Sequence, residues 1–258
     1  MTSRRVSDRR RVSVRWIPGD VAATPFAYLA SPAGDPPVGG LLLLHEAFGL
    51  NTDMQALAER LAERGYAVLA PDLYWRGPDR LAGYEERPKA IAMFKTLPDE
   101  QVLADAARGL DLLAGETRGA PLAVAGLRIG GRYALLVAAR ERRRVRAAVS
   151  YYGAGIDGGT ISPLWTINAI ERIESLRTPM LLFFVGDDPT VPAAEVESID
   201  GRLRRAGAPY EIVRYPGVKP GFVFPGRDTY RDAEAADAWD RTGRFLASAL
   251  AAGPPEAP

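Results

Sequence analysis

The chain has 258 residues, of which 47% are hydrophobic and 25% are charged. This length suits one large α/β domain or two small ones, and the apolar fraction supplies a sizeable core. A formal net charge of +1 argues against nucleic acid and membrane surfaces as partners. With no cysteine, the chain has no disulfide, thiolate nucleophile or thiolate metal site.

No apolar run approaches the roughly 20 residues of a membrane span, and the basic N-terminus lacks the apolar core of a signal peptide. We therefore expect a cytoplasmic protein. Residues 1–10 are expected to be a flexible basic segment, and residues 251–258 a disordered tail rich in Pro and Ala. A single domain is expected between them, over residues 11–250. Only three of the 33 basic residues are lysine, which indicates a GC-rich bacterial genome.

Alternating and continuous apolar runs predict eight strands. In chain order they cover residues 11–16, 26–30, 39–45, 66–70, 122–125, 146–151, 180–185 and 210–215. Helical patterns between them cover residues 51–64, 88–95, 100–116, a segment starting near Gly130, 167–176, 193–206 and 233–250. Asn51 or Thr52 is the expected cap of the first helix, and Gly65 ends it. Strands separated by helices imply crossover connections and a mostly parallel sheet.

The segment Gly126-Leu127-Arg128-Ile129-Gly130-Gly131 joins a buried strand to a helix. It has the form of a nucleophile elbow, in which a strained turn presents the central side chain above the sheet. The flanking glycines allow close backbone approach, because a Cβ there would clash. The central residue is an arginine, which is always protonated and cannot attack a carbonyl. The segment therefore predicts a hydrolase-like elbow without a nucleophile.

Ligands of such sheets bind at the carboxyl ends of the strands. The loops after His45, Ala70, Ala125, Tyr151, Val185 and Tyr215 should therefore surround one pocket. The polar residues expected to line it are Glu46, Arg76, Arg128, Tyr152, Asp187, Asp188 and Lys219.

Several motifs in order and at matching spacing resemble the dienelactone hydrolase family of α/β-hydrolases. They are LLLLHEAFGLNTDM (41–54), ERGYAVLAPDLYWR (63–76), LAVAGLRIGGRYALLVAA (122–139), YYGAG (151–155) and LLFFVGDDPTVP (181–192). The similarity covers roughly residues 11–250. It implies the α/β-hydrolase fold, with a mostly parallel central sheet of about eight strands flanked by helices on both faces.

The family uses a Cys-His-Asp triad with a helper glutamate. The resemblance places the acid at Asp188 and the helper at Glu46, but Arg128 occupies the nucleophile position. The histidine position falls at Pro220 or its neighbour Lys219, and the single histidine, His45, lies on a different strand. Loss of the nucleophile or base of such a triad costs a factor on the order of 10⁶ in rate. We therefore do not expect a conventional serine or cysteine hydrolase.

The resemblance also implies a binding apparatus for a small anionic substrate. The backbone N–H groups of Ala47 and Ile129 would form an oxyanion hole, which does not depend on side-chain identity. Arg76 matches one carboxylate-binding arginine of the family, and Tyr152 matches a pocket tyrosine. The second arginine position aligns near Phe224, and Arg227 three residues later is a candidate substitute.

Several roles stay open from the sequence. Arg128 either closes a dead site by pairing with Asp188 or Glu46, or binds a substrate carboxylate or enolate as a bidentate fork, or points to solvent. His45 is a candidate general base or a structural residue. Glu46 is a second candidate base, provided that burial raises its pKa.

Lys219 is a candidate Schiff-base lysine or simply solvated. Asp187 and Asp188 lack neighbouring His or Cys ligands, so we expect no metal and no other cofactor.

Three functional hypotheses follow. The first is a non-hydrolytic enzyme of cyclase, isomerase or lyase type, acting on a small carboxylated or polycarbonyl metabolite of bacterial secondary metabolism. The second is a pseudo-hydrolase that binds a ligand or a protein partner without catalysis. The third is a hydrolase with a relocated nucleophile, Ser150 or Thr190. An open cavity with Arg128 directed inward favours the first, and a closed salt bridge favours the second. We expect a monomer or a homodimer, and the sequence does not decide between them.

Overall fold

The computed structural model describes residues 11–20, 24–158 and 161–251. The predicted N-terminal segment 1–10 and residues 252–258 of the predicted tail lie outside the described residues. The strands are β1 (Val12–Pro18), β2 (Pro25–Pro32), β3 (Gly39–Leu44), β4 (Tyr66–Pro71), β5 (Leu122–Leu127), β6 (Val145–Tyr151), β7 (Met180–Val185) and β8 (Tyr210–Tyr215). The helices are α1 (Thr52–Ala62), α2 (Arg87–Phe94), α3 (Asp99–Glu116), α4 (Ile129–Arg140), α5 (Ala169–Ile173), α6 (Ala193–Ala206) and α7 (Asp232–Ala251).

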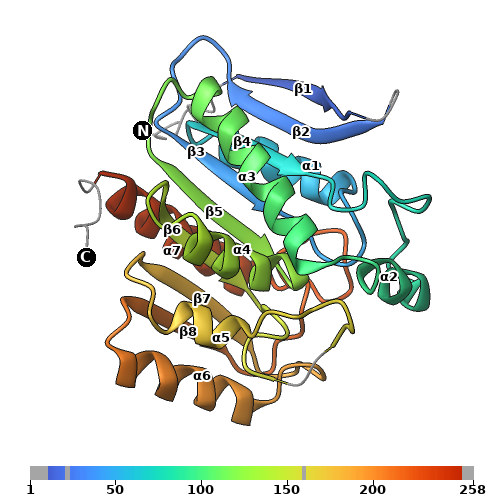
Figure 1. Ribbon diagram of the computed structural model, residues 1–258, viewed down its shortest axis with the longest axis vertical. Coiled ribbons are helices and arrows are strands. Elements are labelled where there is room, and N and C mark those ends of the chain that lie inside the picture. The colour runs from blue at the N-terminus through green and yellow to red at the C-terminus, as the bar shows by residue number, and fades with distance from the viewer. Residues whose placement is uncertain (1–10, 21–23, 159–160, 252–258) are drawn as a thin grey trace, which may run out of the picture.

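The strands form one sheet in the order β1-β2-β4-β3-β5-β6-β7-β8 (Figure 1). β1 pairs with β2, and β2 with β4, in antiparallel fashion, while every other pairing from β4 to β8 is parallel. The predicted mostly parallel sheet is confirmed. Parallel pairing brings the carboxyl ends of β3 to β8 to one edge of the sheet.

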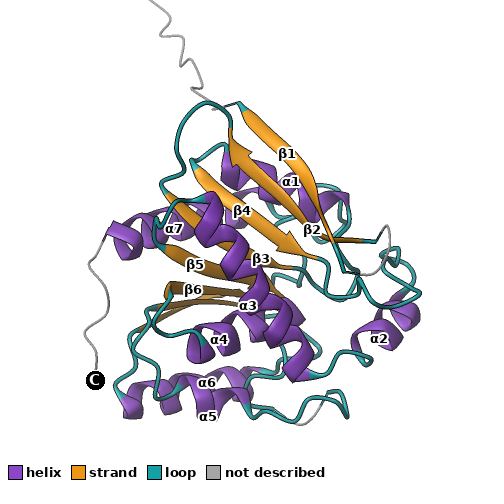
Figure 2. Ribbon diagram, turned by 45° about the horizontal axis from the view of Figure 1, so that its top comes forward, coloured by secondary structure: helices purple, strands orange, loops and turns teal. Residues whose placement is uncertain are grey.

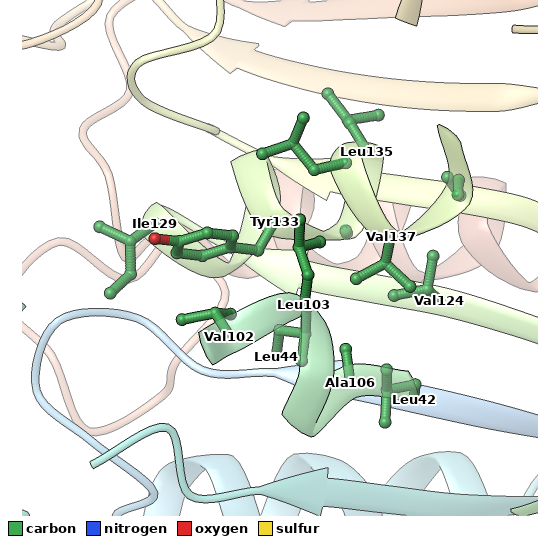
Figure 3. Close-up of a cluster of buried hydrophobic side chains, with 14 of the residues drawn as sticks. Leu42, Leu44, Val102, Leu103, Ala106, Val124, Ile129, Tyr133, Leu135 and Val137 are labelled. Carbon is green, nitrogen blue, oxygen red and sulfur yellow. The ribbon is translucent and has the colours of Figure 1, made fainter. Parts of the chain in front are cut away.

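Helices cover both faces of this sheet (Figures 1 and 2). α3, α4, α5 and α6 share one core with one face, and α1 and α7 share a second core with the other. The strand β3 shows why its apolar run is continuous. Leu42 and Leu44 belong to the first core and Leu41 and Leu43 to the second, because successive side chains point to opposite faces. Figure 3 shows the first core where α3 and α4 meet the strands.

The predicted cap of the first helix is confirmed. The Asn51 side chain accepts a hydrogen bond from the Met54 amide at 3.1 Å, and it satisfies a donor that the first turn of α1 leaves free. Gly65 follows the helix with φ of 104°, a left-handed conformation that glycine adopts without strain.

The helix predicted over residues 167–176 is much shorter than expected. α5 covers only Ala169–Ile173, although the pattern extends further in both directions. The Ile167 amide donates to Asp99 at 2.8 Å, and its carbonyl accepts from Arg132 at 2.7 Å. The Asp99–Arg132 ion pair therefore takes the Ile167 carbonyl, which a helix beginning at this residue would use, and this accounts for the late start of α5.

Within the described residues, the length and apolar character needed to cross a bilayer are not combined in any helix.

Candidate functional site

A cavity of about 560 Å³ opens at the carboxyl ends of the parallel strands. Loops that follow β3, β5, β6, β7 and β8 contribute to its wall, as predicted, whereas after β4 it is helix α2 and Lys95 that contribute, not the loop itself. Of the polar residues predicted to line the cavity, Glu46, Arg128, Asp187 and Lys219 do so, and Arg76, Tyr152 and Asp188 do not. Its lining includes Glu46, Ala47, Phe48, Arg87, Ala90, Ile91, Phe94, Lys95, Arg128, Ile129, Ala154, Ile161, Trp165, Asp187, Pro189, Thr190, Lys219, Pro220, Arg227 and Thr229.

Arg128 occupies a strained turn between β5 and α4. Its backbone has φ of 56° and ψ of −115°, which is rare for a residue with a side chain. A Cβ on Gly126 would collide with the carbonyl of Gly130, and a Cβ on Gly130 with the carbonyl of Leu44. The glycines therefore allow the tight strand–turn–helix form that the sequence predicts, and this turn presents Arg128 to the cavity.

The Arg128 guanidinium binds two groups from the loop after β7. One Nη atom donates to Oδ2 of Asp188 at 2.5 Å, and the other donates to the Thr190 hydroxyl. The Asp188 side chain is only 2% exposed, and its Oδ1 accepts the amide of Thr190 at 2.8 Å. A cation at the N-terminus of α4 is unfavourable by itself, and Asp188 compensates it. Of the two pairings anticipated for Arg128, the structure forms the one with Asp188.

Glu46 pairs instead with Arg227. Nη2 of Arg227 donates to Oε1 of Glu46, and Nη1 of Arg227 donates to Oε2 of Glu46 at 3.3 Å. The Arg227 guanidinium lies 3.8 Å from the ring centroid of Tyr84 and 4.4 Å from that of Phe224. Burial lowers the pKa of Arg227, but the Glu46 carboxylate outweighs burial, so that the net pKa is raised above its ordinary value. This cation is therefore fixed beside the cavity, where the sequence placed a substitute for a carboxylate-binding arginine.

His45 lies behind the cavity and is fully buried. Its Nδ1 is 2.6 Å from the Glu46 carbonyl oxygen, and its Nε2 accepts the Leu73 amide at 2.9 Å. Both ring nitrogens are therefore engaged by the backbone, which favours the structural role over that of a general base.

Arg76 does not line the cavity, contrary to the expectation that the resemblance carried. Its guanidinium binds both oxygens of Asp105 on α3, at 2.5 and 2.8 Å, and lies 4.0 Å from the Trp75 ring centroid. The aromatic neighbour and the nearly buried carboxylate hold it against α3. Arg76 matches the family motif, but in this chain it binds Asp105 on α3 instead of lining the cavity.

Tyr152 lies fully buried next to the site, with φ of 40°. Its hydroxyl has no hydrogen-bond partner among the described residues. Burial, and then the negative charge of Glu46, raise the pKa of Tyr152 well above its ordinary value of 10.0. The hydroxyl therefore stays protonated near neutral pH. Lys219 does line the cavity, on the loop after β8, and its side chain is exposed.

The two backbone N–H groups expected to form an oxyanion hole belong to cavity residues. Ala47 follows Glu46, and Ile129 is the first residue of α4. Neither N–H donates to a described protein acceptor. First-turn amides such as that of Ile129 have no acceptor within their own helix, so they are available to a ligand.

The alternative nucleophiles have no histidine beside them. Ser150 is 1% exposed, and its hydroxyl is unpartnered among the described residues, while the Thr190 hydroxyl accepts from Arg128. The single histidine is engaged elsewhere. The described residues also contain no group of three or more histidine, aspartate or glutamate side chains arranged to hold a metal ion.

One part of the site was missed from the sequence. Helix α2 and the loop after β6 form an apolar wall with Ile91, Phe94, Ile161 and Trp165. The helix was predicted, but its short apolar pattern gave no sign that it faces a cavity rather than the core.

The sheet order and the strand–turn–helix elbow together define the α/β-hydrolase fold. The "Putative Dienelactone Hydrolase" structure from Klebsiella pneumoniae superposes with a TM-score of 0.82 at 28% identity, and the alignment covers 92% of this chain and 99% of that one. This similarity confirms the predicted fold.

The sequence model of the Dienelactone hydrolase family matches residues 26–250, and the chain belongs to this family. The Yersinia pestis "Putative carboxymethylenebutenolidase" is 33% identical over 223 residues, 83% of this chain and 80% of the relative. A Synechocystis protein of the same name is 30% identical over 236 residues, 86% of this chain and 91% of the relative.

Proposed function

We propose that this member of the dienelactone hydrolase family is a non-hydrolytic enzyme acting on a small carboxylated or polycarbonyl metabolite. The observation that carries the proposal is the position of Arg128. Its side chain lines the cavity from the elbow, beside the unpartnered amides of Ala47 and Ile129. A fixed cation and two fixed N–H donors are suited to stabilise an enolate or carboxylate oxygen.

The same position argues against hydrolysis through a covalent intermediate. Arginine stays protonated and cannot act as a nucleophile. Without nucleophile and base, an oxyanion hole and binding alone retain about 10³–10⁴-fold catalysis over water. Isomerisation, cyclisation, dehydration or decarboxylation needs no acyl-enzyme, only orientation and charge stabilisation.

Glu46 is the proposed proton acceptor. Glu46 lines the cavity, where its ion pair with Arg227 holds it as a carboxylate, whereas Asp188 and His45 do not line the cavity and are bound to Arg128 and to the backbone. In the proposed step the C–H bond next to a substrate carbonyl breaks. The proton moves to a Glu46 carboxylate oxygen, and the electron pair moves onto the carbonyl oxygen as an enolate held by Arg128 and the two amides.

A test independent of the natural substrate is proton exchange. The C3 protons of 2-oxobutyrate exchange slowly with solvent, and ¹H NMR in D₂O measures how much the protein accelerates this exchange. We expect acceleration by the unaltered protein and a loss of at least about 10²-fold in Arg128→Gln and in Glu46→Gln. Arg140→Gln is the matched control, because Arg140 is an exposed arginine at the far end of α4. The absence of any acceleration contradicts the proposal.

The pseudo-hydrolase is the second candidate, and the two ion pairs favour it. Arg128 binds Asp188, and Glu46 binds Arg227, so both groups of the proposed step already have a protein partner. This alternative predicts that 2-oxobutyrate binds, as measured by calorimetry, without any proton exchange.

Hydrolysis is tested with an activated ester such as p-nitrophenyl acetate. We expect the unaltered protein and Arg128→Cys both to stay near background, because no imidazole reaches the elbow. Turnover by the unaltered protein at the rate of a true esterase would overturn our interpretation of Arg128.

A further inference from the structure

The lining of the cavity contains two chemically different groups of residues. One group is polar and contains Glu46, Arg128, Arg227 and Thr229. A separate part of the wall is apolar and comes from α2 and the loop after β6. Phe94 and Trp165 pack against each other there, with ring centroids 5.8 Å apart.

We infer that the substrate carries an aromatic or extended apolar body behind its carboxylate or carbonyl head. The inference rests on the proposed function for the placement of the head near Arg128. A cavity of about 560 Å³ is within the range of pockets that bind drug-sized ligands. A head group of a few atoms would fill only a small part of this space.

The apolar wall differs from ordinary surface. Ile91 is 45% exposed, and a single exposed apolar side chain needs no explanation. Ile91, however, lines the cavity together with the buried side chains of Ala90, Phe94 and Trp165. Arg128 lines the same cavity. Phe48 adds a further aromatic ring to the lining. An apolar body that enters this space would remove both its own surface and that of Ile91 from water.

Two cations lie beside the apolar wall, and they would suit a different class of substrate, one that carries a second acidic group. Arg87 and Lys95 lie at the two ends of α2 and line the same cavity. A second acidic group on the substrate would reach them. The residues between them, Ala90, Ile91 and Phe94, are apolar, and they form the larger part of this side of the cavity. The structure therefore favours an apolar body over a second charge.

The experiment compares ligands that share one head. Calorimetry measures the affinities of 2-oxobutyrate, its 4-phenyl and 4-(2-naphthyl) derivatives, and 2-oxoadipate. We expect the naphthyl compound to bind at least about tenfold more tightly than 2-oxobutyrate, because area buried from water increases affinity. Aryl compounds that bind no more tightly than 2-oxobutyrate, or 2-oxoadipate that binds more tightly than both aryl compounds, would overturn the inference.

A pair of substitutions on α2 locates the body. Ile91→Asp places a charge on the apolar wall, and Ala92→Asp places the same charge on the neighbouring exposed residue, which does not line the cavity. We expect Ile91→Asp to weaken naphthyl binding about tenfold and to leave 2-oxobutyrate binding within twofold. Ala92→Asp should leave both unchanged. Equal losses in the two variants contradict the inference, and thermal melts show whether both variants fold.

Proton exchange separates this inference from the proposed function. Exchange of 2-oxobutyrate without any gain from the aryl group would overturn the inference and support the proposed enzyme. A gain from the aryl group without exchange would support the apolar subsite and contradict the proposed enzyme.

Discussion

Two arginines one turn apart at the start of α4, Arg128 and Arg132, differ in burial and in how many of their guanidinium nitrogens have a partner. Arg132 is 1% exposed, and every nitrogen of its guanidinium has a partner. Nε donates to the Gly155 carbonyl at 3.0 Å, Nη1 to Asp99 at 2.7 Å, and Nη2 to both Asp99 and the Ile167 carbonyl. Arg128 has 19% of its side chain exposed, binds only through its Nη atoms, and faces the cavity.

The difference shows how an arginine of the framework is distinguished from one of the site. Arg132 joins α4 to the first residue of α3 and to the loop that carries Trp165, so it holds a wall of the cavity in place. Arg128 keeps a solvent-accessible edge on a strained turn, which is typical of functional positions. The elbow motif separates Arg128 from Arg132 in the sequence, but it gives no sign that Arg132 is buried and paired with Asp99.

The largest expected effect is the loss of stability in Arg132→Met. Removal of one partner of a buried ion pair leaves the other charge unpaired and costs about 3–5 kcal/mol. For a domain of this size the midpoint of thermal unfolding should fall by roughly 10 °C. The double variant Arg132→Met/Asp99→Leu should recover part of this loss, because it leaves no unpaired charge. An unchanged melting temperature in the single variant would contradict a framework role for Arg132.

The second effect concerns binding rather than stability. Arg128→Gln should weaken 2-oxobutyrate binding by about tenfold or more, because hydrogen bonds to charged groups contribute about 1.5–3 kcal/mol. The unfolding free energy should change by only about 1 kcal/mol, since Asp188 keeps the amides of Thr190 and Val191 as donors. Calorimetry and chemical denaturation measure the two quantities. A large loss of stability with unchanged binding would make Arg128 a framework residue like Arg132.

Arg76 provides an intermediate case. It matches a family motif, but it pairs with Asp105 and does not line the cavity. Its side chain is 40% exposed, so the pair contributes at most about 1 kcal/mol. We expect Arg76→Gln to lower stability by that amount and to leave ligand binding within twofold. A tenfold loss of affinity would show that Arg76 takes part in binding, as the resemblance implies.

The smallest expected effect is that of Tyr152→Phe. The Tyr152 hydroxyl is buried without a partner among the described residues, and such a group is costly to bury. Its removal should therefore raise the unfolding free energy of the ligand-free protein by up to about 1 kcal/mol. Ligand binding should stay within twofold, because Tyr152 is fully buried and does not line the cavity. Thermal melts with and without 2-oxobutyrate separate the two effects, and a lower melting temperature without ligand would contradict the expectation.

Much of the fold was predictable because its signals are local. Continuous apolar runs mark β3 and β5, and the side chain of Asn51 caps α1 as predicted. The pattern after Trp165 was misleading at its start, since Asp99 and Arg132 bind the Ile167 backbone and α5 begins only at Ala169. That contact joins residues 68 positions apart in the chain, so a window of neighbouring residues does not contain it.

The candidate site was predictable as a set of loops but not as a set of contacts. Glu46, Arg128, Lys219 and Arg227 all line the cavity, because each follows a strand that ends at the same edge. The apolar wall was missed, since α2 lies in a long irregular segment and its apolar face looks like that of any short helix.

By itself the sequence determined the elbow, because only glycine leaves room at positions 126 and 130 for the turn that presents residue 128. It also determined that this residue is a cation. Only the tertiary structure decided which acid meets that cation. Glu46 and Asp188 both follow strands of one parallel sheet, and the ion pair between Glu46 and Arg227 leaves Asp188 as the partner of Arg128. Such choices depend on the three-dimensional distances between charges, which the order of residues along the chain does not specify.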